Sequence, residues 1–558
     1  MYDWSVPPSQ NERRRPLIVV AGALLAIVIA VGVGMAVGNP PPKLPGASSA
    51  ASSGRQPGPS AVPSGPSTGS VTIYGPQAAS FDPAVQSDAG SAQVVSQLFE
   101  SLTAIDSAGD VQPALADRWQ AAAANTIVFH LRPGLTFSDG TPLTATDVVT
   151  SWMRVLDPTQ PRQLASLLDD VTGARAYREG KGPKSAVGLS VLGTDQVSVA
   201  LAAPASDFPA IASSPTLAVV PSSIDSTNSV LTPQGFVGSG AYLLTGLTSS
   251  ETTLTANPRY WAGTPAIRTV HLVNSIGGKS PVSEFQAGNL DYTPISVFDA
   301  SWIASDSSLG PDLRIEASPS VEFYGFDTSR APFDNVHVRR AFQMGIDWRR
   351  IVALLADPLV QPASGMVPPD VPGHGTTDFG PVFNLDKAKA ELAAAGYPNG
   401  AGFPKVALTT SGAALDQAIV QQLHDNLGID IDYEALDWTS YNDRLLNDPP
   451  AFWEMDWVAD YPGANDFLGL LLGTGKTNNY GRWSSSDFDA AVSQALAAAD
   501  PTAVQQAFDR AQALVVDQAP VIPVDYGAGY SLSSPKLLGA IPNGQGLIRY
   551  AGLAWAGS

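Results

Sequence analysis

An uninterrupted run of apolar and glycine residues at 17–37 constrains the architecture of this chain more than any other sequence feature. It follows Arg13, Arg14 and Arg15 after a single proline. A helix needs roughly 20 apolar residues to cross the hydrocarbon core, so the run predicts a transmembrane helix. The arginines favour a cytoplasmic tail at 1–16, which places the rest of the chain outside the cytoplasm. A cleavable signal peptide is the alternative, although its apolar stretch is normally about 7–15 residues long.

The next segment, 38–70, is rich in proline, glycine, serine and alanine and has almost no large apolar side chain. Such a segment cannot bury enough surface to fold, so we expect a disordered linker. A linker of this length holds a folded body on the order of 30 Å or more from the membrane. The sequence therefore predicts a single-pass cell-membrane protein with its working part outside.

Length and composition limit what that body can be. A chain of 558 residues exceeds the size of one hydrophobic core, so two or three domains are expected. A net charge of −20 argues against nucleic acid as a partner, because phosphate binding needs clustered lysine and arginine. The chain has no cysteine, which excludes thiol catalysis, disulfides, thiolate metal sites and a lipid anchor on an N-terminal cysteine.

From residue 71 the pattern alternates between strands and helices, as in an α/β or α+β protein. The expected strands are 126–132, 196–201 and 521–526. The expected helices are 91–102 with Ser91 as its cap, 144–155, 335–356 with Asn335 as its cap, and one beginning at Asp500 and Pro501.

Two stretches, 277–280 and 473–477, end in Gly-Lys-Ser/Thr like a phosphate-binding loop. The loop also needs a glycine where this chain has Val273 and Leu470, so both stretches are interpreted as surface turns. The five histidines are scattered and show no metal-ligand spacing. Three carboxylates at 430, 432 and 434 could form a cation site but fit a solvated strand face better. No catalytic set is found, and we expect neither an enzyme nor a cofactor.

A series of short motifs runs along the body in a fixed order. They are FDP (81–83), QLFESL (97–102), QPALADRW (112–119), FHLR (129–132), FSDGTPLT (137–144), GSGAY (238–242), NPRYW (257–261), FDNVHVRRAF (333–342) and WVADYP (457–462). Together they resemble the extracellular solute-binding proteins of family 5, the substrate-binding proteins of oligopeptide and dipeptide ABC importers.

The resemblance implies an α/β, two-lobed clamshell of the periplasmic-binding-protein type with an additional third domain, as in the large peptide-binding members. Lobe one would combine residues 71–99, 208–318 and 526–558. The additional domain would be 100–207, and lobe two would be 319–525.

The resemblance also implies a ligand site. Asp460 takes the position at which peptide-binding relatives pair a carboxylate with the peptide's α-ammonium. Backbone around Ser87 and Ala89 would pair with the ligand as an added strand. Further residues expected to line the cleft are Trp438, Trp457, Val458 and Tyr526.

One position departs from the family pattern. Oligopeptide binders place an arginine for the ligand's carboxylate a few residues before the Trp-x-x-Asp block, and this chain has Glu454 there. A carboxylate at that point would repel a ligand carboxylate. Longer peptides with their C-terminus elsewhere, or ligands other than plain peptides, would avoid that repulsion; the family also has members for nickel complexes and oligosaccharides.

The resulting hypothesis is an extracytoplasmic binding protein that delivers peptides or a related solute to the permease and ATPase subunits of an ABC importer. The alternative is a membrane-anchored ligand sensor or a scaffold for envelope biosynthesis. A hydrolase of envelope material is a third reading, and it lacks a catalytic set.

Overall fold

The computed structural model describes residues 69–123, 125–224, 231–355 and 360–557. Within these ranges, no helix has the length and apolarity needed to cross a bilayer. The predicted transmembrane run at 17–37 and nearly all of the predicted linker at 38–70 lie outside the described residues. The predicted body, from residue 71 onward, is described almost in full.

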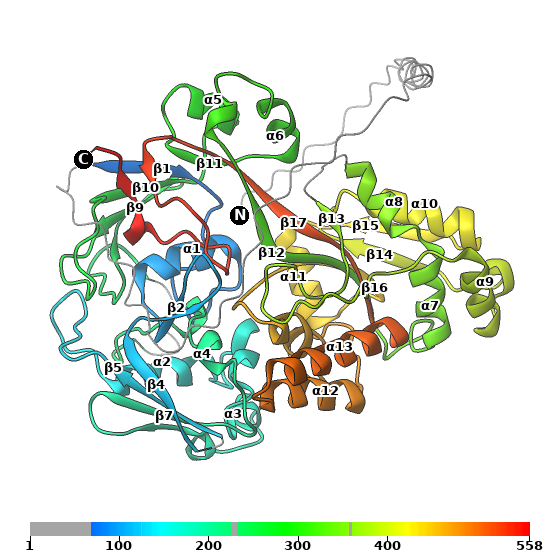
Figure 1. The fold of residues 1–558 in the computed structure, drawn as a ribbon, viewed down its shortest axis with the longest axis horizontal. Coiled ribbons are helices and arrows are strands. Elements are labelled where there is room, and N and C mark those ends of the chain that lie inside the picture. The colour runs from blue at the N-terminus through cyan, green and yellow to red at the C-terminus, as the bar shows by residue number, and fades with distance from the viewer. Residues whose placement is uncertain (1–68, 124, 225–230, 356–359, 558) are drawn as a thin grey trace, which may run out of the picture. The chain divides into compact units, whose positions relative to one another are not determined.

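One large mixed sheet runs through this body (Figure 1). In sheet order its strands are β15 (Ile431–Ala435), β14 (Val406–Thr410), β16 (Phe452–Val458), β12 (Leu313–Phe326), β17 (Val521–Ser533), β11 (Tyr292–Pro294), β1 (Ser70–Tyr74), β10 (Thr269–Val273), β9 (Glu251–Ala256) and β8 (Tyr242–Leu247), and β13 (Gln361–Pro362) pairs with β17. Parallel pairs at β1–β10 and β14–β15 combine with antiparallel pairs at the centre, so the α/β expectation is met.

The two long strands β12 and β17 lie antiparallel at the centre of this sheet (Figure 1). On one side β17 pairs with β11, and on the other β12 pairs with β16, so the two strands join both halves of the sheet. Register shifts between Ala317 and Val321 and between Glu322 and Phe323 interrupt the pairing, and such bulges bend a strand. The sequence predicted only residues 521–526 of β17 as a strand.

A smaller antiparallel sheet is formed within residues 116–200. Its order is β4 (Ala116–Ala123), β5 (Thr126–Leu131), β7 (Gln196–Ala200) and β6 (Leu189–Val191). The helices beside it in the chain are α2 (Ala145–Val155), α3 (Ala174–Arg178) and α4 (Phe208–Ile211), and a hairpin of β2 (Thr103–Ile105) and β3 (Val111–Pro113) precedes it. The strands predicted at 126–132 and 196–201 are confirmed to within one residue.

The remaining elements complete the body. The helices are α1 (Ala89–Leu98), α5 (Pro281–Gln286), α6 (Val297–Ile303), α7 (Val336–Gly345), α8 (Trp348–Val352), α9 (Leu385–Ala394), α10 (Asp416–Leu427), α11 (Trp438–Asn447), α12 (Ser486–Ala497) and α13 (Pro501–Gln518). Two short strands near the C-terminus, β18 (Leu537–Leu538) and β19 (Ala554–Trp555), pair with each other. The predicted caps Asn335 and Asp500 are confirmed, because each side chain accepts hydrogen bonds from the first turn of its helix.

Two predicted helices have different bounds in the structure. Ser91 is not the cap of α1: Asp88 is, and its carboxylate accepts a 2.8 Å hydrogen bond from the Ser91 N–H. The helix expected over 335–356 is broken after Gly345, because Asp347 leaves the helical path and caps a new helix, α8, by accepting from the Arg350 N–H. Helical spacing continues across this break, and so the sequence pattern did not reveal it.

Three large clusters of buried apolar side chains hold the body together, and a fourth, small one lies around α5 and α6. One lies around β1, β8, β9, β10 and α1, and another between β12, β16 and helices α7 to α10. The third runs from the small sheet and α2 to α12 and α13, which joins residues 100–207 to the second half of the chain. Ionic and polar contacts also join these parts; for example, Arg154 pairs with Asp82, and Tyr461 donates to Asp207.

Candidate ligand-binding site

A cleft of about 1270 Å³ is lined by both halves of the large sheet. Its walls come from β1 and α1 on one side, from β16 and α11 on the other, and from the middle of β12 and β17. Residues of the C-terminal segment between 542 and 550 also line it. Pockets for small molecules usually measure about 300–1,000 Å³, so this cleft has room for a short peptide.

Most of the predicted site residues meet in this cleft. Ser87, Ala89, Trp438, Val458 and the pair Trp457 and Asp460 all line it. Trp438 is 48% exposed, whereas Trp457 is 7% exposed and is fixed by a hydrogen bond from its indole N–H to Asp466. An exposed aromatic ring at the wall can adapt to different ligand groups, and the buried one supports the wall itself.

Two predicted residues differ from expectation. Tyr526 is not among the residues that line the cleft: its hydroxyl donates to the Gly365 carbonyl and accepts from the Ser364 N–H, so the ring is held on the far side of β17. Successive side chains of a strand point to opposite faces, and its neighbour Asp525 lines the cleft instead. Ala89 is the first residue of α1, so its backbone is helical rather than extended as the prediction of an added strand required.

Asp460 lies just beyond the end of β16, and its backbone is fixed at both polar atoms. Its N–H donates to Asp466 Oδ2 at 3.1 Å, and its carbonyl accepts from Gln545 Nε2 at 2.8 Å. In the described part of the chain, Asp460 Oδ2 is shielded from solvent and has no hydrogen-bond partner. A desolvated carboxylate oxygen without a partner is costly, so the position suits a cationic ligand group.

The surroundings of Asp460 make its charge unfavourable in the empty cleft. Desolvation raises its pKa to about 7. Asp466, directly behind it, is buried and its pKa is raised well above the usual range by desolvation and by the charge of Asp460. Of this pair, only Asp460 lines the cleft.

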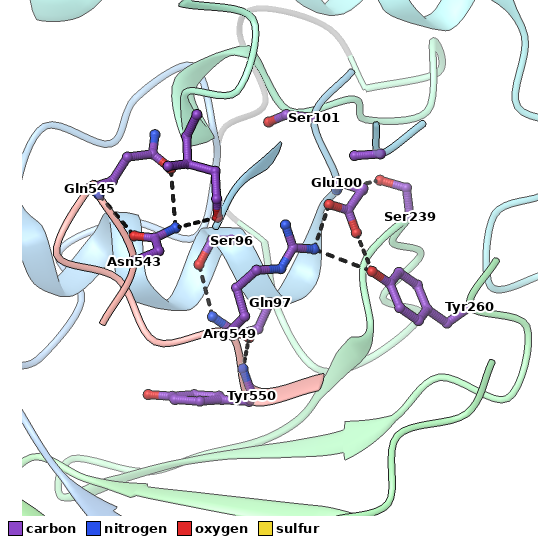
Figure 2. A network of polar contacts seen from close by, with 12 residues as sticks. Ser96, Gln97, Glu100, Ser101, Ser239, Tyr260, Asn543, Gln545, Arg549 and Tyr550 are labelled. Atoms are coloured by element: carbon purple, nitrogen blue, oxygen red, sulfur yellow. Dashed lines mark hydrogen bonds and ion pairs between the residues drawn. The ribbon is translucent and has the colours of Figure 1, made fainter. Parts of the chain in front are cut away.

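The C-terminal segment brings Gln545 to Asp460 and is itself fastened to α1. Gln97 donates to the Ile548 carbonyl at 3.0 Å. It also accepts from the Tyr550 N–H at 2.9 Å (Figure 2). Between these contacts Arg549 pairs with Glu100 at 2.7 Å. Figure 2 shows Tyr260 on the opposite side of Glu100, where its hydroxyl donates to the second carboxylate oxygen. The network therefore holds the wall that positions Asp460.

The cleft is strongly acidic. Among the described residues, its lining includes no lysine, arginine or histidine. It includes six carboxylates: Asp88, Glu316, Glu322, Asp456, Asp460 and Asp525. Glu454, predicted to face the ligand, is instead 5% exposed and lies outside the lining, where desolvation and acidic neighbours raise its pKa to about 8. A carboxyl with this pKa is largely protonated at neutral pH, so Glu454 adds little repulsion of a ligand carboxylate there.

Sequence reasoning missed Glu322, Asp525 and Gln545. A weak signal existed for Asp525, since it is the single acidic residue of β17 and follows the apolar run at 521–524. No pattern pointed to Gln545, because its role depends on a contact with a residue 85 positions away.

Comparison with known proteins agrees with this architecture. Residues 110–479 match the sequence model of the bacterial extracellular solute-binding proteins, family 5. The probable deoxycholate-binding periplasmic protein YgiS of Escherichia coli K12 is 30% identical over 82% of this chain and 88% of its own. The oligopeptide-binding protein OppA of Bacillus subtilis 168 is 26% identical over 84% of this chain and 90% of its own.

A solved structure, that of the murein tripeptide binding protein MppA of Escherichia coli, has the same fold. It aligns with a TM-score of 0.78 and 23% identity over 88% of this chain and 99% of MppA. The family match spans more than half of the chain, and the fold is the two-lobed one that the sequence motifs predicted. The chain therefore belongs to the bacterial extracellular solute-binding proteins of family 5, which is a family of binding proteins rather than of enzymes.

Proposed function

We propose that this protein is the extracytoplasmic substrate-binding component of an ABC importer and that it captures peptides through their free N-terminal amine. The observation that carries the proposal is Asp460, a half-buried residue that lines a peptide-sized cleft and whose carboxylate Oδ2, shielded from solvent, has no hydrogen-bond partner among the described residues. An ammonium supplies both the charge and the hydrogen bonds that this oxygen lacks. A sensor or a scaffold for envelope biosynthesis would use the same cleft, but no feature of the described residues favours these roles over delivery to a permease.

We further propose the division of the body. Lobe one would comprise 71–99, 208–318 and 526–558, the additional domain 100–207, and lobe two 319–525. Both proposed boundaries between the lobes fall within the paired strands β12 and β17, where bulges permit bending. The segment 17–37 would anchor the protein in the membrane by its length and apolarity.

The test is a titration of the purified full-length protein with pentaalanine and, separately, with deoxycholate, the ligand in the name of one relative. Pentaalanine is expected to bind and to raise the melting temperature, because a ligand of the native state stabilises it by mass action. Deoxycholate is an anion and should not bind to a cleft lined by six carboxylates. Binding of deoxycholate without binding of any free-amine peptide would contradict the proposal.

Peptide affinity should depend on pH. In the free protein the pKa of Asp460 is about 7, so below pH 7 the carboxyl holds a proton that an ammonium ligand must displace. Affinity should therefore rise with pH by up to about tenfold per unit until pH 7, and should fall above about pH 8 as the peptide amine loses its charge. The groups near Asp460 do not change the direction of this pH dependence. Asp466 keeps its own proton because its pKa is raised, and Tyr480, with a pKa of about 12, stays neutral.

Calorimetric titration from pH 5.5 to 8.5 in buffers of different ionisation enthalpy checks this expectation. It should show proton release on binding below pH 7. Constant affinity between pH 5.5 and 7 would mean that Asp460 does not ionise on binding.

A further inference from the structure

Three carboxylates form a row across the middle of the cleft. In the strand pairing, Glu322 of β12 lies directly opposite Asp456 of β16 on one side and directly opposite Asp525 of β17 on the other. All three residues line the cleft. Directly paired residues on adjacent strands have their Cβ atoms about 4.5–5.5 Å apart, and like charges in such pairs repel. We call Asp456, Glu322 and Asp525 the acidic row.

The residues around the acidic row increase this repulsion. The pKa of Glu322 is raised well above its usual range by desolvation and by the charges of Asp525, Glu454, Asp456 and Asp416. Among the described residues that line the cleft there is no lysine, arginine or histidine. A row of this kind is unfavourable in the empty protein, and such local conflicts concentrate at functional sites.

Two further acidic residues, Glu454 and Asp416, lie close enough to the acidic row to affect Glu322. Glu454 is on the same face of β16 as Asp456, is 95% removed from solvent, and its Oε2 has no hydrogen-bond partner in the described residues. Asp416, by contrast, accepts from the hydroxyls of Thr410, Tyr324 and Tyr433 at 2.6, 2.8 and 3.0 Å. The oxygens of Asp416 are therefore supplied with hydrogen-bond donors, whereas Oε2 of Glu454 is not.

We propose that the acidic row is a second cation subsite, which selects peptides carrying a lysine or arginine near their N-terminus. The inference rests on the proposed function, in which Asp460 receives the α-ammonium. Asp456 and Asp460 are four residues apart, so their Cα atoms are separated by at most about 14 Å. A basic side chain on one of the first residues of an extended peptide covers that distance, and a guanidinium or ammonium can bridge neighbouring carboxylates.

The test uses pentaalanine and four pentapeptides in which one alanine, at position 2, 3, 4 or 5, is lysine. Calorimetric titration of the full-length protein at pH 7.5 gives the ratio of each Kd to that of pentaalanine. At least one lysine peptide is expected to bind about tenfold more tightly, and added salt should reduce this advantage.

Glu322→Gln and Asp456→Asn provide the matched variants. Each should bring the lysine advantage close to one, and each should raise the melting temperature of the empty protein, because it removes repulsion. Asp430→Asn, which changes a 91% exposed carboxylate outside the lining, is the control that should keep the full advantage.

The possible failures are distinct. If pentaalanine binds and no lysine peptide binds more tightly, the second subsite is refuted and the proposed function stands. If the lysine advantage persists in both variants, the advantage originates elsewhere and the acidic row is not the subsite. If none of the five peptides binds, the proposed function fails first.

Discussion

Asp460→Asn is expected to lower the affinity for pentaalanine by about 100-fold, measured by calorimetric titration at pH 7.5. Losing one partner of a desolvated charge pair typically costs about 2–5 kcal/mol, and 2.7 kcal/mol of that range corresponds to about 100-fold. Asparagine keeps the shape of the side chain, and the two hydrogen bonds of residue 460 are made by its backbone, so they are retained. The substitution therefore removes the charge and leaves the wall in place.

The stability of this variant distinguishes a binding role from a structural one. Since desolvation raises the pKa of Asp460 to about 7, its charge opposes folding above that pH. At pH 8 the melting temperature of Asp460→Asn should equal or exceed that of the parent protein. Asp430→Asn, at an exposed position far from the cleft lining, should change neither affinity nor stability. Unchanged affinity in Asp460→Asn, or a loss of affinity accompanied by a lower melting temperature, would contradict the assignment.

Asp82→Asn is expected to have the largest effect on stability. Asp82 and Arg154 are paired at 2.6 Å with side chains that are 0% and 5% exposed, and Asp82 also accepts from the Ala84 N–H. Breaking a buried ion pair by removing one of its charges typically costs about 3–5 kcal/mol. Urea denaturation followed by tryptophan fluorescence should show this loss in the free energy of unfolding.

Two further variants separate the pair from general sensitivity to substitution. Asp117→Asn removes an acidic partner from an exposed pair, in which the Arg118 and Asp117 side chains are 59% and 31% exposed, and should cost less than about 1 kcal/mol. The double variant Asp82→Leu with Arg154→Met should be more stable than Asp82→Asn, because apolar side chains carry no desolvation penalty. A cost below about 1 kcal/mol for Asp82→Asn would show that the pair does not stabilise the body.

The sequence predicted several strands and helix starts correctly, because these depend on interactions between residues that are close in the chain. Asn335 and Asp500 cap their helices as expected, since a cap depends only on the next three residues. The same reasoning failed at Ser91, where Asp88 offered a competing cap, and at residue 347, where an aspartate began a new helix inside an apolar pattern. Neither competition can be decided from spacing alone.

The candidate site was predicted only as far as the family motifs reach. Those motifs led to Asp460, Trp457 and Trp438, which line the cleft. The acidic row could not be predicted, because it depends on the register between three strands that are far apart in the sequence. Tyr526 was predicted to line the cleft, but its neighbour Asp525 lines it instead. Which of the two faces the cleft depends on the pairing of β12 with β17, and that pairing is irregular near this point.

The most direct measurement of the central claim compares pentaalanine with its N-acetyl derivative on both the parent protein and Asp460→Asn. If Asp460 receives the α-ammonium, acetylation should weaken binding to the parent about 100-fold and should have almost no further effect on the variant, because both changes remove the same interaction. Equal losses on acetylation in the two proteins would show that the amine binds elsewhere and would contradict the account.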